Sequence, residues 1–187
     1  MLTLNLTPAA ASVRAGEREV LMITNADLRE PANLTCWPMQ QRFERKLQTA
    51  LEKTGWHMKR AHDVDNACGH GFISSQKEGS ALFAHIDADA PLIVLLTAWQ
   101  YSHHIAPSLV HHRGPLLLLA NFDGTFPGLV GMLCMAGTLT SLGKTCPDCG
   151  RRISMTPSLS RGWPRGCAMA HCTMQPTICA PLLPPTP

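Results

Sequence analysis

Aromatic and polar side chains follow three short apolar runs of the chain, at 20–24, 92–96 and 116–120. The candidate ligand-binding residues among them are Arg29, Trp99, Gln100, Asn121 and Asp123. The indole of Trp99 offers an apolar platform to the C–H face of a sugar, and its neighbour Gln100 can exchange hydrogen bonds with hydroxyl groups. The carboxylate of Asp123 can accept hydrogen bonds from the same groups. These side-chain types suit a small, hydroxyl-rich ligand.

Each of these residues also has a purely structural interpretation, and the sequence leaves both open. Trp99 can close the end of the hydrophobic core, as a tryptophan near a strand terminus commonly does. The stretch Asn121-Phe-Asp-Gly is typical of a turn, because Asn, Asp and Gly favour turn conformations. The two interpretations of Trp99 predict different exposure: a ligand platform is partly exposed, and a core residue is buried.

Other chemistries are disfavoured by motif and charge. No G-x-G-x-x-G follows the first apolar run, and no phosphate-binding loop ends in Lys-Ser or Lys-Thr. On a helix, His104 and His111 would lie roughly 10 Å apart, too far for two ligands of one zinc ion. We therefore expect no metal site in residues 1–144. A formal net charge of +3 is too small to predict nucleic-acid binding.

The elements that must position the candidate residues alternate along the chain between 19 and 144. The runs 20–24, 92–96 and 116–120 predict buried strands, and 56–60 predicts a further strand. Apolar residues at helical spacing over 39–51 predict a helix after Pro38. Helices are also predicted over 75–89, where Gly79 weakens the pattern, and over 124–143. This order predicts an α/β, Rossmann-like parallel sheet with helices on both faces.

In such a sheet, ligands bind beyond the carboxyl ends of the strands, where the five candidates lie. The uncharged stretch 124–143 is long enough to raise the question of a membrane span. Its glycines, hydroxyl residues and Pro127 favour a buried helix packed on the sheet. No membrane association is expected.

Composition divides the chain into three parts. Residues 1–18 form an irregular N-terminal segment, and 19–144 form the α/β domain. Residues 145–187 hold eight of the fifteen prolines and five of the eight cysteines, with a single acidic residue, Asp148. Such a Pro- and Cys-rich tail cannot bury enough apolar surface to fold, so we expect it to be irregular. No secretory signal begins the chain, which predicts a cytoplasmic protein with reduced cysteines.

Three stretches of the α/β domain resemble a known family. Residues 114–143, with Asn121-Phe-Asp-Gly-Thr-Phe-Pro-Gly leading into a helix of small residues, are similar to the N-terminal domain of the L-fucose/L-arabinose isomerase family. Thr97-Ala-Trp-Gln-Tyr resembles the tryptophan-containing loop of that domain. Asp27-Leu-Arg-Glu resembles its arginine-bearing first loop. The resemblance covers residues 19–144.

The resemblance implies an aldose–ketose isomerase of carbohydrate metabolism in which this domain binds a small-molecule sugar within a homo-oligomer. Arg29 and Trp99 become the leading candidates for sugar contact, whereas Gln100 departs from the family pattern. In such enzymes a divalent metal, typically manganese, is held by later domains. The chain therefore resembles a substrate-binding part that ends before the metal site, with no catalytic residue and no cofactor of its own.

The tail has two competing interpretations. Its cysteines are spaced C-x2-C-x17-C-x4-C, close to a structural zinc spacing, with Cys146, Cys149, Cys167 and Cys172 as ligands. This predicts a zinc-ribbon-like binding and interaction module. Codons can also be chosen so that a shifted frame of 146–156 resembles the family's continuation. We favour the shifted frame, because the tail is inconsistent with the α/β pattern that precedes it.

Overall fold

Parallel strands form the centre of the protein, as the alternating sequence pattern predicts. The computed structural model describes residues 13–122, 124–144 and 167–172. Four parallel strands are β1 (Glu19–Ile23), β2 (His57–Arg60), β3 (Leu92–Leu96) and β4 (Leu116–Asn121), and an antiparallel strand, β5 (Cys167–Cys172), adds to the edge. The sheet order is β2-β1-β3-β4-β5. The α/β, Rossmann-like fold is confirmed.

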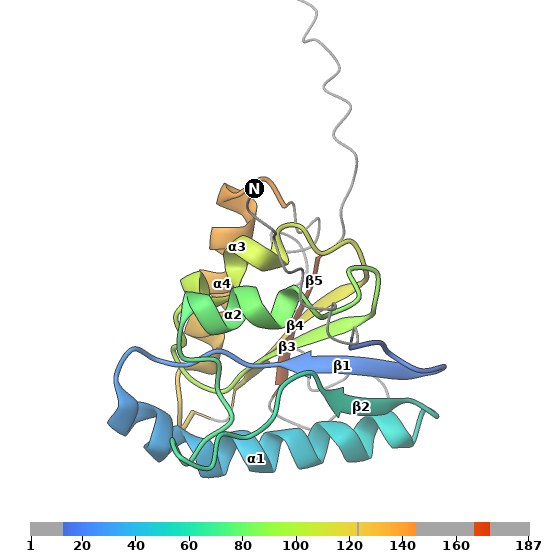
Figure 1. Ribbon diagram of the computed structural model, residues 1–187. Helices are drawn as coiled ribbons and strands as arrows, with labels where there is room; N and C mark the ends of the chain where they lie inside the picture. Colours follow the sequence, from blue (N-terminus) through green and yellow to red (C-terminus); the bar gives the residue numbers. More distant parts are fainter. Residues whose placement is uncertain (1–12, 123, 145–166, 173–187) are drawn as a thin grey trace, which may run out of the picture.

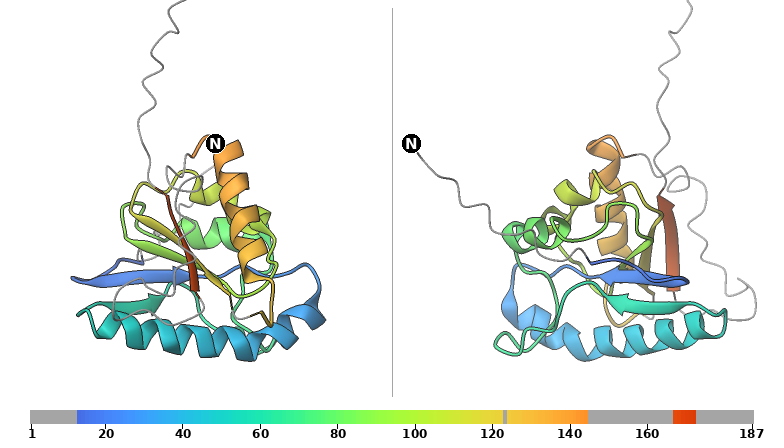
Figure 2. Two further views of the ribbon diagram at one scale, coloured as in Figure 1. Left: turned by 180° about the vertical axis from the view of Figure 1, so that it is seen from behind. Right: turned by 45° about the vertical axis from the view of Figure 1, so that its right-hand side comes forward.

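Helices cover both faces of this sheet (Figures 1 and 2). The long helix α1 (Glu30–Glu52) lies on one face, and α2 (Gln76–Phe83), α3 (Ala106–Leu109) and α4 (Gly128–Ser141) lie on the other. A short 3-10 turn, η1 (Ser102–His104), precedes α3. Because β3 is covered on both faces, all five of its residues are buried, which explains its continuous apolar run.

Each face of the sheet has its own core. Residues that alternate along β1 and β3, such as Met22 and Leu95, pack against Phe43 and Leu47 of α1. The core on the other face is larger. It includes residues of α3 and α4, and Met135 is among its fully buried residues. The alternation of successive side chains between the two faces divides the buried residues of β1 and β3 between the two cores.

Helix α1 begins at Glu30, nine residues earlier than the sequence pattern predicts. Pro38 is expected to mark a helix start, but it lies inside the helix. A proline there leaves the carbonyl of Leu34 without its usual donor. Both residues are on the exposed side of α1, where water can solvate that carbonyl. The buried side chains of Cys36 and Trp37 hold this part of the helix against the core.

Helix α2 is shorter than the predicted 75–89, and Gly79 has a packing function there. The helix begins after Ser75, whose hydroxyl accepts the N–H of Glu78 at 3.2 Å. A Cβ atom on Gly79 would lie 2.1 Å from the carbonyl oxygen of His104. The glycine that weakens the helical pattern therefore permits the close contact of α2 with η1.

A buried lysine holds the segment that follows α4. Lys144 is 1% exposed, and its Nζ donates to the carbonyl oxygen of Leu109 at 2.9 Å and to that of His112. These carbonyls follow the last turn of α3, where a cation is favourable. Burial lowers the pKa of this ammonium group. The sheet itself continues beyond the predicted boundary at residue 144, because β5 pairs with β4.

Strand β5 lies within the tail that composition predicts to be irregular. Its register places Cys167 opposite Asn121 and Cys172 opposite Leu116. The backbone of β4 offers a row of donors and acceptors at its edge, which a neighbouring strand can pair. The remainder of the tail, 145–166 and 173–187, is outside the described residues. Within the described ranges, none of the helices is both long and apolar enough to cross a membrane.

Two glycine substitutions test the contact between α2 and η1. Gly79→Ala should destabilise the fold by about 1–3 kcal/mol, because the new methyl group meets a backbone carbonyl. Gly137→Ala in α4 is the matched control: no atom lies within 4 Å of its Cβ position. That variant should gain about 0.5–1 kcal/mol from helix propensity. Urea unfolding measures both, and an unchanged midpoint for Gly79→Ala would contradict the contact.

Candidate functional site

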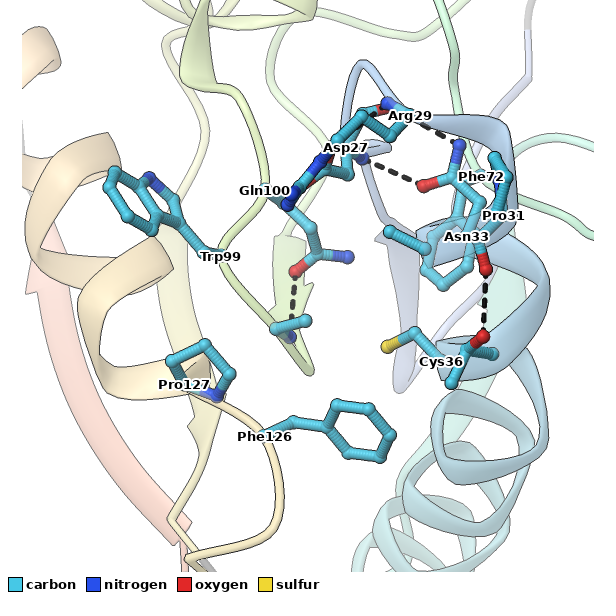
Figure 3. Close-up of a pocket in the computed structure, with 13 residues that line it drawn as sticks. Asp27, Arg29, Pro31, Asn33, Cys36, Phe72, Trp99, Gln100, Phe126 and Pro127 are labelled. Atoms are coloured by element: carbon cyan, nitrogen blue, oxygen red, sulfur yellow. Dashed lines mark hydrogen bonds and ion pairs between the residues drawn. The ribbon is translucent and has the colours of Figure 1, made fainter.

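A pocket of about 420 Å³ opens where β1 and β3 end (Figure 3). From β1 the chain leads through α1 on one face to β2, whereas β3 is followed by η1, α3 and β4 on the other side. The boundary between β1 and β3 is therefore the topological switch point of the sheet, where α/β proteins bind ligands. Of the five candidates, Arg29, Trp99 and Gln100 line this pocket.

An ion pair forms the polar wall. Both Nε and the backbone N–H of Arg29 donate to Oδ1 of Asp27 at 2.9 Å, and Nη2 donates to Oδ2 at 3.0 Å. The guanidinium lowers the pKa of Asp27, which keeps this carboxyl ionised. Asn33 fixes the same loop, because its Oδ1 accepts the N–H of Asp27 at 2.8 Å. The pair is thus held in place before any ligand arrives.

Arg29 remains able to contact a ligand while it is paired. Its side chain is 74% exposed, whereas that of Asp27 is 9% exposed. A guanidinium has five N–H donors, and the side-chain contacts with Asp27 use two of them. The exposed end of Arg29 can therefore donate hydrogen bonds into the pocket.

The opposite wall carries the indole predicted to be a ligand platform. Trp99 is 52% exposed, lies in the loop after β3 and lines the pocket beside Pro127. Figure 3 shows it across the pocket from Pro31, Asn33 and Cys36 of α1. The exposure excludes the interpretation of Trp99 as a core residue, because a core tryptophan would be almost fully buried.

Gln100 lines the pocket as a positioning residue. Its amide nitrogen donates to the hydroxyl of Thr24 at 3.2 Å, and its amide oxygen accepts the N–H of Ala98 at 3.4 Å. The side chain is 2% exposed. Both ends of the amide are therefore engaged in holding the loop that presents Trp99.

Asn121 lies away from the pocket lining. It ends β4 and is 6% exposed. A Cβ on Gly128 would lie 2.6 Å from the carbonyl oxygen of Asn121, so the start of α4 packs closely on this strand end. Asn121 thus supports the helix behind Trp99. Asp123 is outside the described residues.

Apolar side chains that sequence reasoning missed complete the pocket. Cys36, Phe72 and Phe126 line it, and the ring of Phe72 meets Trp37 edge-on at 5.3 Å between centroids. Burial raises the pKa of the Cys36 thiol to about 12, so the group stays protonated and forms part of an apolar wall. Phe126 lies within the stretch 121–128 that carries the family resemblance, and no other feature of the sequence pointed to a role for it in the site.

The N-terminus of α1 faces the pocket but does not suit a phosphate. Its first turn carries the carboxylate of Glu30, and Pro31 supplies no N–H. Nδ2 of Asn33 donates to Oε2 of Glu30 at 3.3 Å, and Oε1 lies 3.0 Å from Nε2 of buried His70. A fixed negative charge at a helix N-terminus repels an anion from the place where it would bind. The pocket favours a neutral ligand.

The loop after β2 fixes the end of β1 through His62. Its Nε2 accepts the N–H of Thr24 at 3.4 Å, which requires that nitrogen to be unprotonated. Burial, together with the nearby charge of Arg60, lowers the pKa of His62 to about 4. The imidazole is therefore neutral at pH 7, and it serves as a hydrogen-bond acceptor behind the site.

The zinc interpretation of the tail meets a geometric constraint in β5. Cys146 and Cys149 are outside the described residues. Cys167 and Cys172 are the two ends of one strand, and five residue steps separate their Cα atoms by about 17 Å. No group of three or more His, Cys, Asp or Glu among the described residues could hold a metal ion.

Comparisons with known proteins give no family: no protein-family model, no curated protein and no solved structure matches the chain. Function is therefore argued from the chemistry of the pocket.

Two tryptophan substitutions separate the exposed platform from the core beside it. Trp99→Ala should lower the free energy of unfolding by about 1 kcal/mol or less, because half of its surface already faces solvent. Trp37→Ala should cost about 3–5 kcal/mol, because that ring is 8% exposed. Denaturant unfolding measures both. Equal losses for the two variants would show that Trp99 is part of the core.

At acidic pH, protonation of His62 should lower the free energy of unfolding. Its pKa rises from about 4 in the folded protein to about 6.5 on unfolding, so between these pH values the unfolded state binds more protons. Stability should therefore be complete above pH 6.5 and fall by on the order of 3 kcal/mol as pH decreases to 4. His62→Gln, which keeps an acceptor for Thr24, should flatten this decrease in urea unfolding at a series of pH values. If the stability of His62→Gln decreased with pH as steeply as that of the original protein, the decrease would not be caused by His62.

Proposed function

We propose that this protein binds a neutral carbohydrate in the pocket at the ends of β1 and β3. In the wider setting that the family resemblance implies, it is the substrate-binding part of an aldose–ketose isomerase of the L-fucose/L-arabinose type. The observation that carries the proposal is the half-exposed indole of Trp99 opposite the Asp27–Arg29 ion pair. Aromatic face and hydrogen-bonding groups thus lie on two sides of one pocket.

The two walls match the two kinds of surface that a sugar presents. A pyranose has an apolar C–H face, which can stack on an indole, and a rim of hydroxyl groups. Those hydroxyls can accept from the exposed N–H groups of Arg29 and donate to the carboxylate of Asp27. A volume of about 420 Å³ is within the range of small-molecule pockets.

The charge distribution supports a neutral sugar over a sugar phosphate or a nucleotide. Glu30 places its carboxylate at the N-terminus of α1, which elsewhere would attract a phosphate group. The sequence carries no glycine-rich phosphate loop after β1. Both observations favour a ligand whose recognition depends on hydroxyl groups.

The residues that line the pocket support binding rather than turnover. The carboxylate of Asp27 is held ionised by Arg29, and the thiol of Cys36 is held protonated by burial. Neither group is poised to exchange a proton near neutral pH, as general acid–base catalysis requires. Isomerisation would need acid–base and metal groups from outside residues 1–144.

Calorimetric titration with L-fucose, L-arabinose and related aldoses tests the proposal. At least one sugar should bind, and Trp99→Ala and Arg29→Ala should each weaken it by about tenfold, equivalent to 1.4 kcal/mol. Trp56→Ala is the matched control, because that indole is 40% exposed and lines a different pocket at the other ends of the strands. The Trp56→Ala variant should bind the sugar with the same affinity as the original protein.

Two outcomes would contradict the proposal. The first is the absence of binding by every sugar. The second is binding that Trp99→Ala and Arg29→Ala leave unchanged. A ketose-forming assay with manganese measures the related expectation that the chain has no turnover, and ketose formation would contradict the assignment of a binding part alone.

A further inference from the structure

A second, apolar groove lies at the opposite ends of the strands. Its volume is about 300 Å³, and all the residues that line it are uncharged. They include Val20, Leu51, Trp56, Pro91, Pro115 and Leu117. Trp56 is 40% exposed although it lies beside buried leucines. The groove therefore presents an aromatic ring and two prolines, and the hydroxyl group of Thr54 in its lining already donates to the carbonyl of Leu51 at 2.7 Å.

The groove exists because α1 alone covers this face of the sheet (Figures 1 and 2). The last turn of α1 brings Leu51 to one side of the groove, and β4 forms the other side through Leu116 and Leu117. The helices α2, α3 and α4 pack on the opposite face. Leu117 of β4 is consequently only partly covered there, whereas Leu92 and Leu116 beside it are buried.

The chain itself leads to this groove. β5 runs antiparallel to β4, so its last residue, Cys172, lies opposite Leu116. Leu116 lines the groove. The last described residue of the strand therefore lies beside the groove, and residues 173–187 follow it in the sequence. Six residues from Cys172 reach Ile178, and an extended chain of that length spans up to about 20 Å.

The composition of this C-terminal segment fits the groove. Residues 173–187 contain no Asp, Glu, Lys or Arg, and Ile178, Leu182 and Leu183 provide apolar side chains. Four prolines lie among the last seven residues. Proline-rich segments favour the polyproline II conformation, lose little entropy on binding and dock in grooves lined by aromatic rings. An uncharged, Pro-rich segment thus meets an uncharged groove that contains an indole.

We propose that residues 178–185 of the same chain dock in the groove between the end of α1 and the start of β4, with prolines against Trp56. The attachment at Cys172 makes the contact intramolecular, which raises the effective concentration of the segment at the groove. The proposal is independent of the carbohydrate site, because the two pockets lie at opposite ends of the strands.

Fluorine NMR of the full chain labelled with 5-fluorotryptophan tests this contact. The four tryptophan resonances are assigned with single Trp→Phe variants, and a soluble nitroxide broadens each resonance according to its exposure. The exposed fractions of Trp56 and Trp99 in the structure are 40% and 52%. If the segment docks, the nitroxide should broaden Trp56 far less than Trp99. Leu182→Asp with Leu183→Asp should remove that protection and leave Trp99 unchanged.

The control variant is Thr173→Asp with Gln175→Asp, which adds the same charge outside the docking residues and should keep Trp56 protected. A chain that ends at Cys172 should reproduce the loss of protection. Equal broadening of Trp56 in the original protein and in the Leu182/Leu183 variant would overturn the proposal. Protection that disappears on dilution, with a dimer in sedimentation, would also overturn it and assign the groove to a second copy.

Discussion

Buried Thr24, at the carboxyl end of β1, joins the segments on which the site depends. Its hydroxyl donates to the carbonyl of Leu95 at 2.7 Å and accepts from Gln100 at 3.2 Å. Its N–H donates to His62, and its carbonyl accepts the N–H of Ile73 at 2.9 Å. Four backbone and side-chain groups from distant parts of the chain thus meet at one residue that water does not reach. A network of this kind is rigid when every member is satisfied.

The inner strands β1, β3 and β4 were predictable because burial on both faces selects one kind of sequence, whereas β5 lies in the tail that was predicted to be irregular. Leu92–Leu96 was predicted with its observed bounds, since a fully covered strand has no solvent-facing position that breaks the apolar run. Helix α1 was predicted with its first two turns missing. Local preference assigns Pro38 to a helix start, whereas the packing of Cys36 and Trp37 extends the helix before it. Tertiary contacts of this kind have no local signature.

The site was partly predictable for a related reason. Parallel strands bring their carboxyl ends to one edge, so Arg29, Trp99 and Gln100 were expected near one another, and they line one pocket. The pairing of Arg29 with Asp27 depends on a loop conformation that Asn33 fixes six residues later. The exposure of Trp99 depends on the position of α4. Neither follows from spacing along the chain, because both require the packed structure.

The antiparallel pairing of β5 with β4 has a consequence for the behaviour of the protein in concentrated solution. The first five residues of β4 are four leucines and an alanine, and β3 already occupies its other side. A free strand edge with this composition is a template for pairing with another chain, and sheet proteins commonly protect such edges. β5 covers the edge with six residues of the same molecule. A chain without residues 167–172 would leave this edge of β4 free to add strands from its neighbours, the first step toward aggregation.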